Sequence, residues 1–337
     1  MHESRREFLR LFGTAAAAGI AGIRSQSVNA EPPPETTRIR LPKVPSICIA
    51  PVYVAEVLLR AEGFTDISYV GSGVTFAGVP GAQMMGEGEA DIGMNFAAPL
   101  VIGLDRGAAI SVLGGVHVGC FELFGSPRVS SIKDLKGKMV SVLAKESAQH
   151  VFLASIATSV GLDPNRDIEW VYQPAGEGKR LLAEGKIDAY LGFPPDPQEL
   201  REKKIGRMLL NSAVDRPWSQ YFCCMVVANR DWVRKHPAAA KRALRAILKG
   251  SELCASDPEL AVNAYLGQGY TPNPDYARQA LRDLPYGRWR DYNPEDTMRF
   301  YALRLREAGM VKSPPQKLVS QGTDWRALDQ LKRELKV

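Results

Sequence analysis

The sequence has little cysteine, no long apolar run and no strong excess of charge of either sign. Five cysteines among 337 residues are too few for a disulfide scaffold, and their odd number leaves at least one free thiol. Lysine and arginine number 43 against 37 aspartate and glutamate residues, interspersed along the chain, which argues against a nucleic-acid-binding surface. No segment approaches the roughly 20 consecutive apolar residues of a transmembrane helix. We therefore expect no nucleic-acid partner and no membrane span.

What is present is the composition of an ordinary globular protein, with 45% hydrophobic and 24% charged residues. A chain of 337 residues exceeds the size at which a single hydrophobic core stops growing. The length therefore predicts two lobes.

Residues 1–30 have the three parts of an export signal. A basic segment contains the pair Arg5-Arg6, an apolar stretch of about 13 residues follows over Leu11–Ile23, and Val28–Ala30 is a small-x-small cleavage pattern. The apolar stretch is too short to span a bilayer, and its alanines and glycines form no amphipathic face. Paired arginines of this kind resemble a twin-arginine signal, so we predict export to the periplasm over the alternative, a short N-terminal helix.

A proline-rich segment over 31–37 is predicted to be a flexible leader. Beyond it, short β-type runs alternate with helical patterns, which predicts an α/β fold with mainly parallel sheets. After Asn229 only helical patterns occur. The predicted strands are Arg38–Leu41, Ile67–Gly71, Asp91–Asn95, Ile110–Val116, Met139–Leu143, Ile168–Tyr172, Asp188–Phe193 and Tyr221–Ala228. The predicted helices include Val52–Ala61, Ala148–Val160, Gly178–Glu184, Pro237–Cys254, Pro258–Leu266, Asp275–Leu284 and Pro294–Ala308.

Loops that follow the strands are the candidate ligand-binding segments, because open α/β sheets bind ligands beyond the carboxyl ends of their strands. In the first half of the chain, Gly73 allows close backbone approach, Asn95 can cap a helix and Phe96 can supply a planar wall. The alternative for each is ordinary turn or cap chemistry. The candidates here are Cys48, Pro51, Tyr53, Ser72, Gly73, Asn95, Phe96 and His117.

In the second half, Ser147 opens a helix after a strand. Free N–H groups at a helix start, together with a serine side chain, suit an anion or a carbonyl group. Gln149 or His150 in the first turn is expected to hydrogen-bond a ligand, the alternative being a surface position. The candidates here are Ser147, Gln149, His150, Phe193, Asp196 and Tyr221.

Four segments at 58–64 (LLRAEGF), 86–93 (GEGEADIG), 131–138 (SIKDLKGK) and 182–189 (LAEGKIDA) resemble a known family. It is the nitrate/sulfonate/taurine-type solute-binding proteins of ABC importers, which also includes binders of thiamine pyrimidine precursors. The resemblance implies a type II periplasmic-binding-protein fold, with two lobes joined by a hinge of two crossing strands and a C-terminal helical region. Residues 38–120 and 225–337, with the helical tail, would form lobe 1, and 121–224 would form lobe 2.

The resemblance also implies a function. The chain is expected to be a monomeric periplasmic receptor, neither an enzyme nor dependent on a cofactor, that delivers a small molecule to an ABC permease by closing on it. The second-half loops contain no arginine that could clamp nitrate or a sulfonate in bidentate fashion. A small organic ligand, heteroaromatic, amide-bearing or sulfonate, is therefore ranked above nitrate.

Two alternative functions remain open on the same scaffold. One is an enzyme of pyrimidine-precursor synthesis, which would need iron or a pyridoxal cofactor. The other is a sensory module that presents its ligand to a membrane receptor. No His-x-x-x-His or Cys-x-x-Cys spacing occurs, and adjacent Cys223 and Cys224 on a strand point to opposite faces, so the spacing predicts no dedicated metal site.

Overall fold

The computed structural model describes residues 31–71, 77–270 and 272–335. The predicted export signal and the candidates Ser72 and Gly73 lie outside these ranges. All described helices and strands belong to one compact unit, Pro34–Val337.

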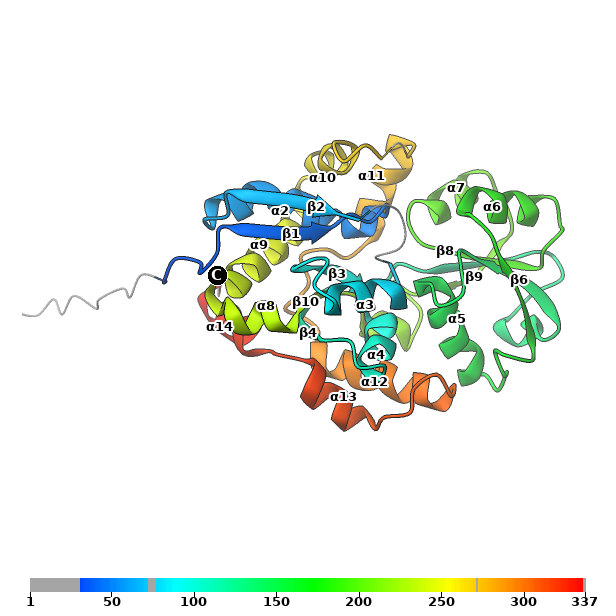
Figure 1. The fold of residues 1–337 in the computed structure, drawn as a ribbon. Coiled ribbons are helices and arrows are strands. Elements are labelled where there is room, and N and C mark those ends of the chain that lie inside the picture. The colour runs from blue at the N-terminus through cyan, green and yellow to red at the C-terminus, as the bar shows by residue number, and fades with distance from the viewer. Residues whose placement is uncertain (1–30, 72–76, 271, 336–337) are drawn as a thin grey trace, which may run out of the picture. The chain divides into compact units, whose positions relative to one another are not determined.

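The described strands form three sheets (Figure 1). β1 (Arg38–Pro42) pairs in parallel with β2 (Asp66–Val70). The three-stranded sheet has the order β3 (Ile92–Phe96), β10 (Phe222–Asn229), β4 (Ile110–Val118). The five-stranded sheet has the order β7 (Ile168–Tyr172), β6 (Lys138–Val142), β8 (Ala189–Gly192), β5 (Glu122–Gly125), β9 (Arg207–Asn211).

Helices surround these sheets, and after β10 the described chain forms helices only, as the sequence predicts. Up to β10 they are η1 (Ile47–Ile49), α2 (Ala50–Ala61), α3 (Val79–Gly86), α4 (Ala97–Asp105), η3 (Ile132–Leu135), α5 (Ala148–Ser159), α6 (Ala175–Ala183), α7 (Asp196–Glu202) and η4 (Trp218–Gln220). After β10 they are α8 (Arg230–Lys235), α9 (Pro237–Ser256), α10 (Pro258–Leu266), α11 (Pro274–Asp283), α12 (Pro294–Glu307), α13 (Pro315–Gly322) and α14 (Arg326–Glu334).

The predicted strands and helices are confirmed, with ends that differ by three residues at most. The strands β5 and β9 were not predicted. The expectation of mainly parallel pairing is wrong: only β1–β2, β6–β7 and β6–β8 are parallel, while β10 and β5 run antiparallel to both of their neighbours. Helices α2, α5 and α6 are the crossovers that connect the parallel strands, whereas β5 and β10 enter their sheets from a strand of another sheet.

The chain changes sheet twice, over 119–121 between β4 and β5, and over 212–221 between β9 and β10. The two crossings touch: the Ser212 hydroxyl accepts hydrogen bonds from the backbone N–H groups of Cys120 (3.0 Å) and Phe121 (2.9 Å). Gly119 has a φ of +70°, and a Cβ there would lie 2.5 Å from the Cβ of Ala213. Only glycine therefore allows this close approach.

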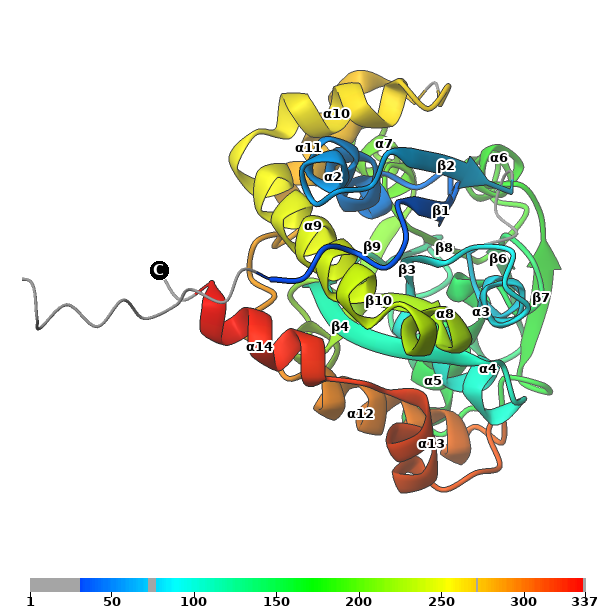
Figure 2. The same ribbon diagram turned by 60° about the vertical axis from the view of Figure 1, so that its left-hand side comes forward.

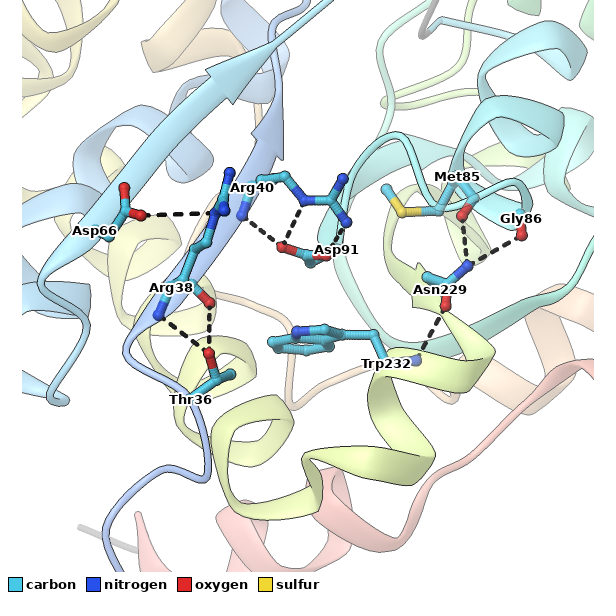
Figure 3. A network of polar contacts seen from close by, with 9 residues as sticks. All are labelled: Thr36, Arg38, Arg40, Asp66, Met85, Gly86, Asp91, Asn229 and Trp232. Carbon is cyan, nitrogen blue, oxygen red and sulfur yellow. Dashed lines mark hydrogen bonds and ion pairs between the residues drawn. The ribbon is translucent and has the colours of Figure 1, made fainter.

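The segment 86–93 that carries the family resemblance is structural (Figure 3). The buried Asp91 carboxylate accepts hydrogen bonds from the backbone N–H (2.7 Å) and Nη2 (2.6 Å) of Arg40, which joins β1 to the start of β3. Asn229 donates from Nδ2 to the carbonyl oxygens of Met85 and Gly86 at 3.0 Å, and its Oδ1 caps α8 at the Trp232 N–H. These polar contacts hold the two smaller sheets together.

Helix α9 packs along α2 (Figure 2). At their contact, a Cβ on Gly250 would lie 2.5 Å from the Pro51 carbonyl oxygen, so the glycine lets the two backbones approach closely. The N-terminus of α9 is capped by Glu35 from the predicted leader, which accepts hydrogen bonds from the N–H groups of Ala238 and Ala239 at 2.9 Å. The end of the leader is thus held in place.

Candidate functional site

The starts of helices α3 and α5, which follow strands of different sheets, meet directly. The Val79 N–H donates to the Glu146 carbonyl oxygen at 3.2 Å. Gly78 has a φ of +104°, and a Cβ there would lie 2.8 Å from the same oxygen. Asn95 holds this turn, because its Oδ1 accepts from the Gly78 N–H and its Nδ2 donates to the Gly78 carbonyl, both at 3.1 Å. Loops from both halves of the chain therefore converge here.

An ion pair stands beside this meeting point. Arg106, just after α4, donates from Nη1 and Nη2 to the two carboxylate oxygens of Glu146, at 2.7 and 2.8 Å. The bidentate contact from Arg106 lowers the pKa of Glu146. Both side chains are partly exposed, 46% for Arg106 and 30% for Glu146. Water therefore screens the pair, and it contributes little to the stability of the fold.

A buried aromatic cluster connects the same two parts of the chain. The ring of Phe96 at the end of β3 lies 5.1 Å from that of Phe121 in the first crossing and 5.8 Å from that of Phe193 after β8. Phe121 in turn stacks on Phe152 of α5 at 4.5 Å. Phe96 and Phe193, predicted separately as candidate walls, are thus brought together.

A second convergence gathers sulfur and imidazole groups. Cys48 of η1, His117 of β4, Cys120 of the first crossing and Cys224 of β10 are all buried, and their potential ligand atoms lie within 4.8 Å of one another. Strand pairing places His117 opposite Cys224. The sequence spacing gave no sign of this group, because its members come from three separate segments.

His117 is held at both ring nitrogens. Nδ1 lies 3.1 Å from the Val118 carbonyl oxygen and Nε2 lies 3.1 Å from that of Cys48. Its ring also meets the ring of Tyr286 edge-on at 4.8 Å. Burial alone would lower the pKa of His117, but Cys224, Cys48 and the Val118 carbonyl together outweigh it and raise the pKa to about 9.

The first turn of α5 has the expected serine cap. The Ser147 Oγ accepts from the His150 N–H at 3.3 Å. The His150 Nδ1 accepts from the Glu146 N–H at 3.3 Å, and its ring lies 4.6 Å from that of Trp170. Burial lowers the pKa of His150 to about 4, so this ring is neutral at pH 7. Gln149 is buried beside it.

Other predicted candidates make contacts typical of the fold. Tyr53 Oη donates to the Val44 carbonyl oxygen (2.7 Å) and accepts from its N–H (2.8 Å). Tyr221 stacks on Phe300, with ring centroids 3.9 Å apart. Two further candidates are buried or paired: Pro51 lies in the first turn of α2, and Asp196 accepts from Tyr190 Oη at 2.7 Å and pairs with Lys179 at 2.8 Å.

Sequence reasoning missed a polar region between α7 and α11. Arg201 donates to the buried Glu122 at 3.1 Å and pairs with Asp283, while Gln198 donates to the same aspartate at 3.0 Å. A hollow of about 660 Å³ lies here. No sequence motif predicts this region, and the sequence signal is limited to acidic and basic residues that occur together on α7 and α11. The hollow is lined by Gln198, Arg201, Glu202, Asp275, Tyr276, Gln279, Arg282 and Asp283.

Comparison with known proteins identifies the class. The fold is that of periplasmic binding proteins. The nitrate-binding protein NrtA from Synechocystis PCC 6803 matches with a TM-score of 0.74 at 13% identity, over 91% of each chain. The alkanesulfonate-binding protein SsuA from Xanthomonas axonopodis pv. citri matches with a TM-score of 0.67 at 17% identity, over 86% of this chain and 99% of that one.

Residues 78–261 match the family described as NMT1/THI5 like, and the chain belongs to this family. A curated relative, the 4-amino-5-hydroxymethyl-2-methylpyrimidine phosphate synthase of Uromyces fabae, is 26% identical over 190 residues, 52% of this chain and 54% of that protein. The chain thus spans about half the length of this relative. Among the described residues, no helix is both long enough and apolar enough to cross a membrane.

Proposed function

We propose that the protein is a periplasmic solute receptor that binds a small organic molecule between its two lobes and presents it to an ABC permease. The observation that carries this proposal is the convergence of the α3 start, with Gly78 and Asn95, on the α5 start, with Ser147, from different sheets of a periplasmic-binding-protein fold. Helix starts offer N–H groups to a ligand, and two of them from separate lobes can grip it on closure.

The proposal keeps the predicted lobe limits, 38–120 with 225–337 for lobe 1 and 121–224 for lobe 2, and export of a monomer by the predicted twin-arginine signal. The aromatic cluster around Phe96 and Phe193 favours a ligand with a planar or apolar part. A heteroaromatic, amide-bearing or sulfonate compound fits better than nitrate, because Arg106, a cation beside the helix starts that could clamp an anion, already pairs with Glu146.

A thermal-shift screen of such compounds, with nitrate and bicarbonate included, tests the proposal. A ligand at 100 times its Kd should stabilise the protein by about 2.7 kcal/mol. Calorimetric titration then compares the wild type with Ser147→Ala. If Ser147 contacts the ligand, the variant should bind more weakly by roughly 0.5–1.5 kcal/mol. Unchanged affinity with a lowered melting temperature would make Ser147 a helix cap only, and a shift with nitrate alone would reverse the ranking of ligands.

A second candidate function is synthesis of a pyrimidine precursor, because the curated relative from Uromyces fabae is a 4-amino-5-hydroxymethyl-2-methylpyrimidine phosphate synthase. The full chain would then form that product, detectable by mass spectrometry. Reversible, stoichiometric binding of an exogenous solute without product would favour the receptor.

A further inference from the structure

Four potential metal-ligating side chains lie together in the interior. Cys48, His117, Cys120 and Cys224 are between 0% and 4% exposed. They come from η1, from the end of β4, from the first crossing and from β10, so the fold itself brings them within 4.8 Å of one another. Two cysteines stand outside this group, Cys254 and Cys223, the second of which is adjacent in sequence to Cys224.

We propose that Cys48, His117, Cys120 and Cys224 form a closed four-ligand site for a thiophilic metal ion, with zinc as its occupant. Three cysteine sulfurs and one imidazole are a donor set that zinc takes in tetrahedral structural sites. With four protein ligands no coordination position stays open, so the ion would stabilise the structure rather than perform chemistry.

The spacing agrees with a tetrahedral ion. Zinc–sulfur bonds of about 2.3 Å at a tetrahedral angle separate two sulfurs by about 3.8 Å. The Cys120 and Cys224 sulfurs are 3.7 Å apart. The limit of 4.8 Å on the remaining pairs means that small side-chain movements bring all four donors to bonding distance.

The surroundings supply the outer contacts that such sites need. A metal-bound histidine commonly donates its other ring N–H to a backbone carbonyl, and both carbonyl oxygens near His117, those of Val118 and Cys48, can serve. Metal binding would displace one ring proton of His117, so that one nitrogen keeps its N–H and its carbonyl partner while the other binds the ion. Three thiolates, a neutral imidazole and Zn²⁺ leave one negative charge, and the Ser46 hydroxyl, 2.9 Å from the Cys48 sulfur, can donate to it.

The position of the site indicates what the ion does. It would tie η1, which leads into α2, to the first crossing between the sheets and to β10. These segments lie where the chain passes from one sheet to the other, and the ion would hold their positions relative to one another. Removal of the ion should therefore lower the melting temperature of the full chain, since binding to the folded state alone stabilises it.

Cobalt(II) titration of the full chain, purified with a reductant and stripped of metal, tests the proposal. The wild type should bind one equivalent and show sulfur-to-cobalt charge-transfer bands with the intense visible bands of a tetrahedral site, and zinc should remove both. Cys224→Ser and His117→Ala should each weaken cobalt binding at least tenfold.

Two matched controls separate the site from general damage to the core. Cys223→Ser and Cys254→Ser replace buried cysteines outside the four and should leave the cobalt spectrum unchanged. If a variant fails to fold, the cobalt spectrum of the wild type alone still decides whether the site binds metal. Absence of thiolate bands, equal loss in the two controls, or a Cys120–Cys224 disulfide in protein isolated from its native compartment would overturn it.

Discussion

Glu122 carries its carboxyl group in surroundings that disfavour a charge. It is 5% exposed, and its Oε2 is buried with no hydrogen-bond partner among the described residues. Burial raises the pKa of Glu122, Asp283 raises it further and Arg201 lowers it, with a net value of about 7. Arg201 at 3.1 Å is thus too weak a partner to keep this buried carboxylate fully charged at pH 7.

This raised pKa predicts a pH dependence of stability. Because the folded chain holds the Glu122 proton more tightly than the unfolded chain, whose value is near 4.5, the stabilisation is complete below about pH 4.5 and is lost as the pH rises through about 7. The full effect is at most about 3 kcal/mol. In Glu122→Gln, whose side chain cannot ionise, the free energy of unfolding measured in urea should change less between pH 5 and 8. At pH 8 it should be higher than that of the wild type.

The exposed Glu89→Gln provides the matched control and should leave the profile unchanged. Parallel profiles for the wild type and Glu122→Gln would show that another group titrates in this range.

At the scale of elements, the contact between the α3 and α5 starts depends on a glycine. Gly78 adopts φ +104° and ψ −160°, a region that is essentially restricted to glycine, and its missing Cβ makes room for the Glu146 carbonyl oxygen. Asn95 hydrogen-bonds both of its backbone groups and so prevents the turn from relaxing.

Gly78→Ala should therefore lower the free energy of unfolding through two separable effects, backbone strain at positive φ and a steric clash with the Glu146 carbonyl oxygen. Gly107→Ala isolates the backbone strain, because Gly107 has a φ of +87° with nothing within 4 Å of its missing Cβ. We expect about 1 kcal/mol for Gly107→Ala, and at least about 1 kcal/mol more for Gly78→Ala because of the steric clash. Urea denaturation measures both, and equal losses would show that the α5 start simply moves away.

At the scale of the whole molecule, two ion pairs among the described residues join the two proposed lobes. The Arg106–Glu146 pair links the end of α4 to the segment before α5, and the Arg201–Asp283 pair links α7 to α11. Both pairs are partly exposed, so in the proposed receptor they would adjust the balance between open and closed forms rather than dominate it.

Arg106→Gln should weaken binding of a ligand found by the screen by up to about fivefold, since an exposed pair is worth about 0.2–1 kcal/mol. The effect should shrink in high salt. Small-angle scattering at saturating ligand should still show the compact form.

Arg60→Gln breaks a comparably exposed pair, Arg60–Glu56, inside α2 and should leave affinity unchanged. A loss of affinity in Arg60→Gln equal to that in Arg106→Gln would mean that net charge, and not the link between lobes, sets the effect.

The sequence by itself determined the elements, because their signals are local. Asp257, Asn273 and Asn293 each precede a proline and cap α10, α11 and α12 with their side chains, so these starts are readable from two adjacent residues. The family resemblance likewise led to the correct fold. The strands β5 (ELFG) and β9 (RMLLN) escaped notice, since neither alternates apolar and polar residues.

Only the tertiary structure decided which candidates meet. Phe96 and Phe193 come together, while Tyr221 packs on Phe300 instead. Nothing in the spacing of Cys48, His117 and Cys224 predicts that they converge, because strand pairing and the crossings between sheets bring distant segments together, and local patterns carry no record of those pairings. Propensity and capping act over a few residues, whereas a site is assembled across the whole chain.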